Sequence, residues 1–400
     1  MGRLARSAAA WGAVVLVPLA GCGGGESSKT AAKATTVCPA PKQDQLTPVV
    51  MAVPDSPVPV KGSDGRYHVV YELDLANYAR SDATVQNVEV FDPSSGHVVV
   101  SLPASQFVKR FESREKNPGQ LDPGGHGLLA MHVSFASPSA IPSALEHRLL
   151  LANVEPSPVT ETGACTALAA PTDLVLSPPL RGARYLAGDG CCDSTLHVRA
   201  LLPVNGRVRD AQRFAIDWEQ LDDHGRIYNG PRDDLKSYTI YGQEIHAAAD
   251  ARVHTVLDGL PQEVPGAFNK SLPLSETDGN SVILDLGHGR YAFYAHMQPG
   301  SIRVKPGETV KRGQVLGLVG NSGNTLAPHV HFHVMDGPSP IDSNGLPYVL
   351  SSFSVSERGV STEVFGQAES GGTPLQVEPV PVPGTHHDEL PLDLSVVTFG

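Results

Sequence analysis

Apolar and polar residues alternate along the first half of the chain. Apolar side chains occupy every second position from Val69 to Leu75, and similar short runs recur at 88–90, 98–102, 129–135 and 147–154. Side chains two residues apart lie on the same face of a β-strand. Turn residues, such as Pro-Ser-Ser-Gly at 93–96, separate the runs. Residues 38–155 are therefore predicted to form an antiparallel β-sandwich.

The second half of the chain also favours strands over helices. Between residues 181 and 353, short apolar runs are separated by Gly, Asn and Pro turns, and no helical period interrupts them. Strands are expected at 213–218, 245–249, 253–257, 281–286, 291–296, 314–319 and 329–335. Residues 156–180, rich in Pro, Thr and Ala, are expected to be a linker. Residues 354–400 are expected to form a Pro-rich tail whose final strand packs back onto a β domain.

The expected fold class is all-β, and the N-terminal sandwich resembles an immunoglobulin-like module. The 400 residues include 40 Gly and 34 Pro but only 6% aromatic residues, which is typical of short strands joined by many turns. A content of 40% hydrophobic and 18% charged residues is that of folded globular domains. The net charge of −12 and the lack of a long basic run argue against a nucleic-acid partner.

The N-terminus has the pattern of an export signal. Two arginines, Arg3 and Arg6, precede an apolar run at 8–20 that is too short to span a bilayer. The run ends in Leu-Ala-Gly-Cys at 19–22, which resembles the lipobox of bacterial lipoproteins. The sequence thus predicts a signal peptide at 1–21, lipidation of Cys22 and a flexible tether at 22–37. The protein would then be a membrane-anchored, extracytoplasmic lipoprotein of the cell envelope; the alternative is an ordinary secretory signal.

Four further cysteines would then lie in an oxidising compartment. Cys38 and Cys165 flank the predicted sandwich and are expected to form a disulfide. Cys191 and Cys192 are adjacent, and the sequence leaves their partners open.

Three histidines alternate near the end of the second domain. His329, His331 and His333 follow a Gly/Ser/Asn turn and are expected on one face of a strand. Neighbours on that face are about 7 Å apart, so two of them can converge on one metal ion. A hydrolytic zinc site adds a carboxylate and an open position for water. The isolated His68, His97, His126, His132 and His147 are expected on the surface, and His224, His386 and His387 in solvated segments.

Several motifs of the second domain occur together in a known family. They are VKPGETV at 304–310, RGQVLG at 312–317, GNSG at 320–323, PHVHF at 328–332 and YAHM at 294–297. Together they resemble the LytM and lysostaphin type of zinc metallopeptidase, which cleaves peptide cross-links of bacterial cell walls. The resemblance covers about 185–353 and implies the family's duplicated hybrid motif, a β-sheet core.

The resemblance also implies roles for individual residues. Asp217 and His331 match zinc ligands of the family, and His329 and His296 match its catalytic histidines. The implied reaction is attack of zinc-activated water on a peptide carbonyl. The implied substrate is peptidoglycan or another exported peptide.

The chain departs from the family at one ligand position. Where the family has a His four residues before the carboxylate, this chain has Arg213, and a guanidinium cannot bind a metal. One interpretation is that Arg213 forms an ion pair with Asp217. The nearest substitute ligand is then His333, on the strand face of His331. His197 and His246 are further candidates, although the sequence does not fix their distance from Asp217.

Two functions therefore remain open from the sequence. The first is an exported lipoprotein with a LytM-like zinc metalloendopeptidase domain that hydrolyses peptide bonds of peptidoglycan. The second is a degenerate domain that has lost its metal and binds wall peptides or regulates another hydrolase. The choice between the two functions depends on Arg213, which stands where the family has a metal ligand.

Overall fold

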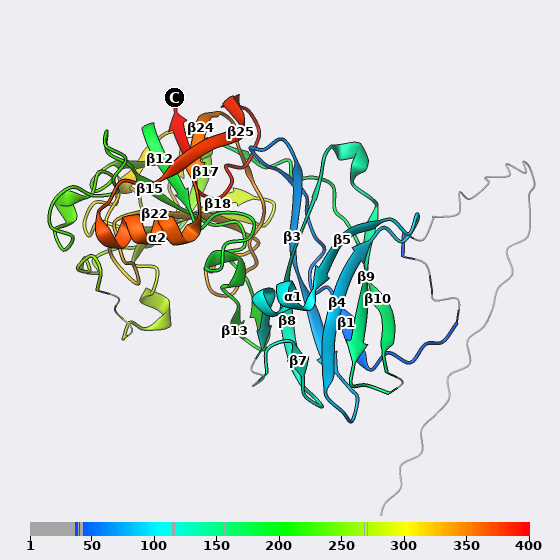
Figure 1. Cartoon of the computed structure of the whole chain (residues 1–400). Coiled ribbons are helices and arrows are strands. Elements are labelled where there is room, and N and C mark those ends of the chain that lie inside the picture. The colour runs from blue at the N-terminus through cyan, green and yellow to red at the C-terminus, as the bar shows by residue number, and fades with distance from the viewer. Residues whose placement is uncertain are drawn as a thin grey trace, which may run out of the picture. The chain divides into compact units, whose positions relative to one another are not determined.

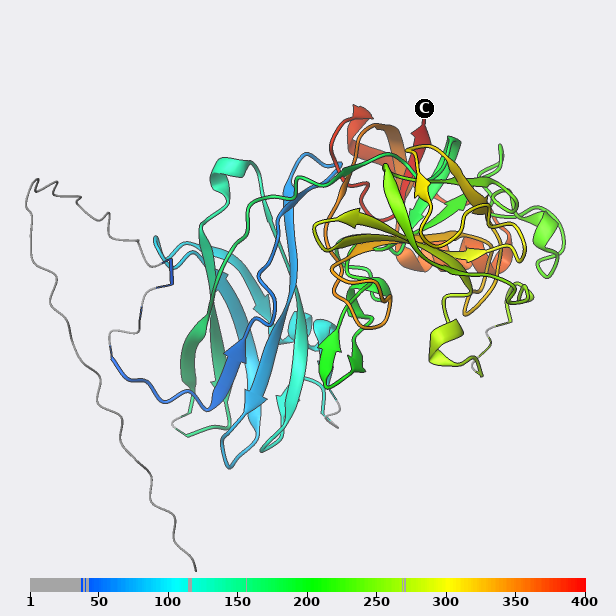
Figure 2. The same ribbon diagram turned by 180° about the vertical axis from the view of Figure 1, so that it is seen from behind.

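The computed structural model describes residues 37, 38, 40, 43–113, 117–155, 157–267, 269 and 271–400. The predicted signal peptide, Cys22 and nearly all of the tether lie outside these residues. The described chain is nearly all β, as the alternating pattern predicts (Figures 1 and 2). Among the described residues, no helix is long and apolar enough to cross a membrane.

The N-terminal part is a sandwich of two five-stranded sheets. One sheet contains β1 (Val49–Ala52), β3 (Tyr67–Asn77), β8 (His126–Phe135) and β6 (Phe111–Ser113), with β2 (Val60–Lys61) beside β3. The other contains β10 (Val159–Ala167), β9 (Ala144–Ala152), β4 (Ala83–Phe91) and β5 (Val98–Pro103), with β7 (Gln120–Leu121) beside β4. The apolar positions at 69, 71, 73 and 75 are buried in a core that also takes Phe107 of helix α1 (Ala104–Arg110).

The sandwich extends further along the chain than predicted. Residues of the expected linker form strand β10, which pairs antiparallel with β9. β-Branched residues Val159, Thr160 and Thr162 favour this strand despite the neighbouring prolines. Within β10, Cys165 is joined to Cys38, with their Cα atoms 5.7 Å apart. The disulfide thus ties the start of the sandwich to its last strand.

The surface prediction for the histidines of the sandwich is wrong for two of them. His147 is 0% exposed, accepts a hydrogen bond from the Tyr71 hydroxyl at 2.8 Å and donates to the Ala164 carbonyl at 3.1 Å. His68 is also buried, on the first sheet. Burial is possible because every ring nitrogen of these two side chains has a polar partner.

The C-terminal part is built around a sheet of ten strands. In sheet order they are β20 (Thr309–Val310), β17 (Ala251–Leu257), β18 (Asn280–Gly287), β19 (Arg290–Met297), β22 (Val330–Met335), β15 (Ile216–Gln220), β12 (Gly182–Gly188), β26 (Ser395–Phe399), β24 (Phe353–Gly359) and β25 (Val377–His386). All neighbours pair antiparallel. The seven strands expected from the sequence of this part are all present, within a few residues of their expected bounds.

Short elements complete this part. The pairs are β11 (Val175–Leu176) with β23 (Val349–Leu350), β13 (Leu202–Val204) with β14 (Arg207–Arg209), and β16 (Glu244–His246) with β21 (Val315–Leu318). The 3-10 turns are η1 (Pro138–Ala140), in the sandwich, and η2 (His197–Arg199), η3 (Leu235–Ser237) and η4 (Leu274–Glu276).

The expected domain boundary at residue 353 is wrong, because three strands beyond it belong to the large sheet. Strands β24, β25 and β26 continue the sheet next to β12, and helix α2 (Thr362–Gly371) connects β24 to β25 (Figure 1). Ser361 caps the helix by accepting a hydrogen bond from the Val364 amide at 3.2 Å. His386 is not solvated either: its ring stacks on Phe353, and its Nδ1 lies 2.5 Å from Glu389.

Candidate active site

Two neighbouring strands place a carboxylate opposite a histidine. Asp217 on β15 and His331 on β22 are direct partners in the antiparallel register. Because directly opposed residues point to the same face of a sheet, their side chains meet. His331 Nδ1 lies 2.8 Å from Asp217 Oδ1. The strand register thus brings together the two residues that the family resemblance implies as zinc ligands.

His197 completes the donor set. It belongs to turn η2, and its Nε2 lies 3.3 Å from Asp217 Oδ2. Its Nδ1 donates a hydrogen bond to the Asp189 carbonyl at 2.8 Å, which turns Nε2 toward the carboxylate. One ligand atom each from His197, Asp217 and His331 lies within 4.8 Å of the others. Such a cluster of two imidazoles and one carboxylate is a suitable zinc donor set.

His333 does not take the ligand position expected from the sequence. It is 0% exposed and lies behind His331, with its Nδ1 2.8 Å from His331 Nε2. Its ring packs 5.1 Å from that of Phe293. Burial, followed by the neighbouring His331, holds the pKa of His333 well below its usual value. His333 is thus a neutral partner that orients His331, because it faces the ring nitrogen opposite to the one near Asp217.

Arg213 contacts the sandwich, and the expected ion pair with Asp217 is not formed. Its Nε and Nη2 bind the two carboxylate oxygens of Glu72 on β3 at 2.9 and 2.6 Å, and its Nη1 donates to the Gly345 carbonyl at 3.3 Å. Arg213 is 7% exposed and lies before β15 begins, so its side chain does not follow the face of Asp217. Residue 213 therefore cannot serve as a metal ligand and instead forms a buried ion pair with Glu72.

His246 is also excluded from the metal cluster. It is buried on β16 and donates from Nδ1 to the Gly313 carbonyl at 3.1 Å. Of the two further candidates left by the sequence, only His197 therefore reaches Asp217. No periodic signal marks His197, since it lies in a turn rather than on β15, and only the fold brings it close to Asp217.

A second pair of histidines lies beside the donor set. The rings of His296 and His329 are 4.6 Å apart, and both are buried. Each donates from Nδ1 to a backbone carbonyl at 2.8 Å, His296 to Ser322 and His329 to Ala327. Both Nε2 atoms are thereby left to act on a bound molecule, and that of His329 is buried without a hydrogen-bond partner. His296 also has a positive φ of 61°, an uncommon conformation for this residue type that often marks functional sites.

A cavity of about 370 Å³ opens onto both groups. Its lining includes His197, Asp217, His296, His329 and His331, and further carboxyls from Asp189, Glu219, Asp278 and Glu369. Burial alone would raise the pKa of Asp217, but its histidine neighbours, His329 and His197, hold it well below the usual value. Burial raises the pKa of Asp278 to about 6. Asp217 is thus the carboxylate that stays ionised, as a metal ligand must.

Comparisons with known proteins find similarity to part of the chain. Residues 237–343 match the model of Peptidase family M23, a segment that contains His296, His329 and His331 but not His197 or Asp217. Peptidoglycan DD-endopeptidase ShyA of Vibrio cholerae is 35% identical over 65 residues, and ShyB of the same organism gives the same identity over the same length. Each match spans 16% of this chain and only 15% of the relative.

Solved structures of M23 proteins are similar over a longer segment but at lower identity. The catalytic domain of lysostaphin from Staphylococcus simulans is 18% identical and covers 41% of this chain and 88% of its own, with a TM-score of 0.23. The catalytic domain of the prophage-encoded protein EnpA from Enterococcus faecalis is 19% identical, covers 44% and 88%, and has the same TM-score of 0.23.

Proposed function

We propose that the LytM-type M23 peptidase domain of this chain is an active zinc endopeptidase that cleaves peptide bonds of peptidoglycan. The observation that carries the proposal is the cluster of His197, Asp217 and His331, whose donor atoms lie within 4.8 Å of one another. His197 replaces the nitrogen donor that Arg213 cannot supply. With this substitute, the departure from the family motif is compatible with a retained metal.

The residues of the site have separate tasks. A zinc ion held by His197, Asp217 and His331 would polarise a peptide carbonyl and acidify a water molecule. His329 Nε2 lies 3.4 Å from Asp217 Oδ1, next to the donor set, where it can accept a proton from the attacking water. His296 uses its ring proton at Nδ1, so its neutral ring presents a lone pair at Nε2 that can accept a hydrogen bond from the attacking water or the leaving amine. Backbone carbonyls hold both rings at Nδ1, so neither needs to reorient during the reaction.

The substrate class follows from the relatives and the cavity. The curated relatives are named peptidoglycan DD-endopeptidases, which supports peptidoglycan as the substrate of this chain too. Another exported peptide would fit the same chemistry. The cavity of about 370 Å³ beside these residues offers space for a segment of a peptide.

Hydrolysis of purified peptidoglycan tests the proposal. Wild-type protein should release new amino groups from it, chelation should stop the release, and added zinc should restore it. Asp217→Asn should lower the rate by at least about a hundredfold, since it weakens a metal ligand. Asp223→Asn, in an exposed turn, is the matched control and should keep full activity. A zinc-loaded wild-type protein that cleaves no peptide bond would contradict the proposal.

The alternative is a domain that binds wall peptides or regulates another hydrolase without cleaving. Arg213 at the family's ligand position is the observation in its favour. The same assay separates the two, because a degenerate domain would retain peptidoglycan in a pull-down and release no amino groups.

We further propose that the chain is a lipoprotein held at the cell envelope through Cys22. The Leu-Ala-Gly-Cys sequence at 19–22 and the apolar run before it support this proposal. Cys22→Ser should move the protein from the membrane to the soluble fraction. Equal membrane content of both forms would refute lipid attachment at this residue.

A further inference from the structure

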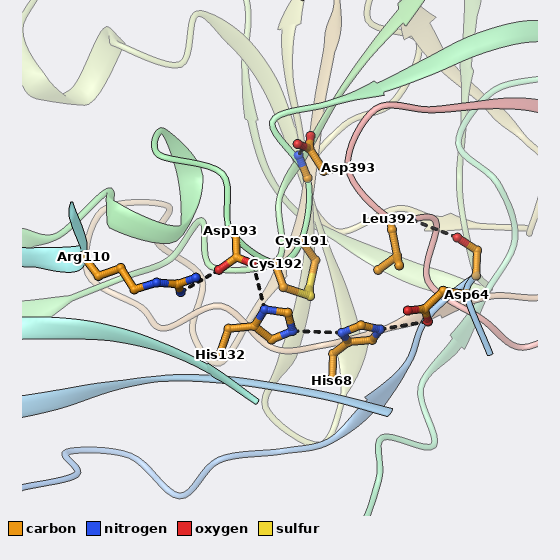
Figure 3. Close-up of a disulfide and its surroundings, with 11 residues drawn as sticks. Asp64, His68, Arg110, His132, Cys191, Cys192, Asp193, Leu392 and Asp393 are labelled. Carbon is orange, nitrogen blue, oxygen red and sulfur yellow. Dashed lines mark hydrogen bonds and ion pairs between the residues drawn. A yellow bond between two sulfur atoms is a disulfide. The ribbon is translucent and has the colours of Figure 1, made fainter. Parts of the chain in front are cut away.

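A second group of metal-ligand side chains lies where the sandwich meets the peptidase domain. His68 on β3 and His132 on β8 point from the same face of the first sheet, since Val70 is the register partner of His132. The loop after β12 faces them and carries Cys191 and Cys192, joined by a disulfide (Figure 3). The two domains thus contribute different donor types to one place.

Each imidazole has a carboxylate behind it. His68 Nε2 lies 3.0 Å from Asp64 Oδ1, and His132 Nδ1 lies 2.9 Å from Asp193 Oδ2 (Figure 3). Arg110 also binds Asp193, at 2.6 Å. A carboxylate oxygen accepts hydrogen bonds, so each imidazole donates from the ring nitrogen that faces away from the other ring.

The two remaining nitrogens face each other. His68 Nδ1 and His132 Nε2 are 2.9 Å apart. Two neutral imidazoles carry two ring protons, and both are used in the bonds to the carboxylates. Two lone pairs at this distance repel unless a positive charge lies between them. The pair therefore requires either a third, shared proton or a metal ion, and histidines that bind a metal commonly donate their other ring N–H to a carboxylate, as both do here.

A sulfur atom completes the group. One donor atom each from His68, His132 and Cys192 lies within 4.8 Å of the others. Cys191, the other half of the disulfide, is not a member of this group. A cavity of about 410 Å³ is lined by both histidines and both cysteines and provides a route for a metal ion or a reductant. His68 and Cys192 are 5% and 7% exposed, so a bound ion would be largely shielded from water.

We propose that His68 and His132 form a second zinc site, in which Cys192 becomes the third ligand when the Cys191–Cys192 disulfide is reduced. A dithiol reductant supplies two electrons and two protons, becomes a disulfide itself and leaves thiols at both positions. Zinc binding then releases the Cys192 thiol proton and the proton shared by the imidazoles. Thiolate adds to two imidazoles as a strong zinc ligand, so the redox state sets the affinity. The site does not depend on the proposed peptidase activity.

Two single substitutions test whether the thiol of Cys192, rather than that of Cys191, binds the metal. Cys191→Ala leaves a permanent thiol at Cys192 inside the cluster, whereas Cys192→Ala leaves one at Cys191 outside it. Both variants keep the Cys38–Cys165 disulfide, because no reductant is needed. Both substitutions are made in an Asp217→Asn background, which weakens zinc binding at the active site. Titration with Zn²⁺, and with Co²⁺ as a spectroscopic probe, then measures metal binding to the group of His68, His132 and Cys192.

Cys191→Ala should bind one zinc ion at least about tenfold more tightly than Cys192→Ala, with a thiolate-to-cobalt absorption band that the control lacks. Adding His132→Gln to Cys191→Ala should remove both the tight binding and the band. Equal affinities of the two cysteine variants, or tight binding that survives His132→Gln, would overturn the proposal. If Cys191→Ala does not fold, reduced wild-type protein with and without His132→Gln gives the same comparison.

Discussion

At the scale of single residues, His333 orients His331 rather than contributing to the donor set. It faces His331 Nε2, so that His331 keeps Nδ1 directed at Asp217. His333→Leu should weaken zinc binding roughly 10- to 100-fold, as loss of such a partner does in other metal sites. His333→Glu should keep most of the affinity, because a carboxylate also accepts from His331 Nε2. A competition titration with a chromophoric chelator measures both, and equal affinity of the leucine variant and wild type would exclude the orienting role.

The buried His147 predicts a pH dependence of the sandwich. Burial lowers its pKa from 6.5 to about 4, despite the hydrogen bond to Ala164. Between these values the unfolded chain binds more protons than the folded one. The stability is therefore present above pH 6.5 and lost as the pH falls toward 4, by up to about 3 kcal/mol.

Hydrogen exchange of peptides from β9 and β10 measures this effect locally. In wild type their protection should fall between pH 6.5 and 4 after correction for intrinsic exchange. His147→Gln should flatten the profile because it removes the titrating group, and His97→Gln, at an exposed position of the same sandwich, should leave it unchanged. An identical profile for both variants would rule out His147 as the cause.

At the scale of elements, the C-terminal strand is a test of the extended sheet. β26 lies between β12 and β24, and the ring of Phe399 packs 5.5 Å from Tyr185 and 5.2 Å from Trp218. Phe399→Ala should destabilise the peptidase domain by about 3–5 kcal/mol, the range for a large buried side chain. Val382→Ala, at a 42% exposed position of β25, is the control and should cost little. Urea denaturation followed by circular dichroism decides, and a Phe399→Ala midpoint close to the control would mean that the tail is not part of the core.

The elements also show where sequence reasoning succeeds and where it stops. Alternation located β3 and β8 because one strand face is buried and the pattern repeats every two residues. It missed β10 and β25 because prolines, which cannot donate to a sheet ladder, interrupt both segments. The family resemblance linked Asp217 with His331, and the pairing of β15 with β22 accounts for their short distance. His197 comes from a turn, and only the folded chain shows that it reaches the same carboxylate.

At the scale of the whole described chain, Arg213 couples the sandwich to the segment that precedes β15, through its ion pair with Glu72. Removing one partner of a buried ion pair is expensive because the other charge remains without compensation. Glu72→Gln should therefore destabilise the protein by roughly 3 kcal/mol, the lower end of the usual range, since Asp210 lies 3.9 Å from Arg213 and compensates in part. Zinc binding should be unchanged, because Arg213 does not contact the metal ligands.

The matched double substitution distinguishes this pair from ordinary packing. Arg213→Met combined with Glu72→Leu removes both charges and should recover most of the lost stability. Thermal unfolding and zinc content of the single and double variants provide the comparison. A double variant as unstable as Glu72→Gln alone would show that an uncompensated buried charge is not the cause of the lost stability.

The central claim, that His197 replaces the missing family ligand, is tested most directly by zinc analysis of one variant. Oxidised wild-type protein, dialysed free of loosely held metal, should contain about one zinc ion per chain, and His197→Ala should contain almost none. His246→Ala, which removes a buried histidine outside the cluster, should keep the wild-type zinc content. Wild-type zinc content in folded His197→Ala would contradict the account.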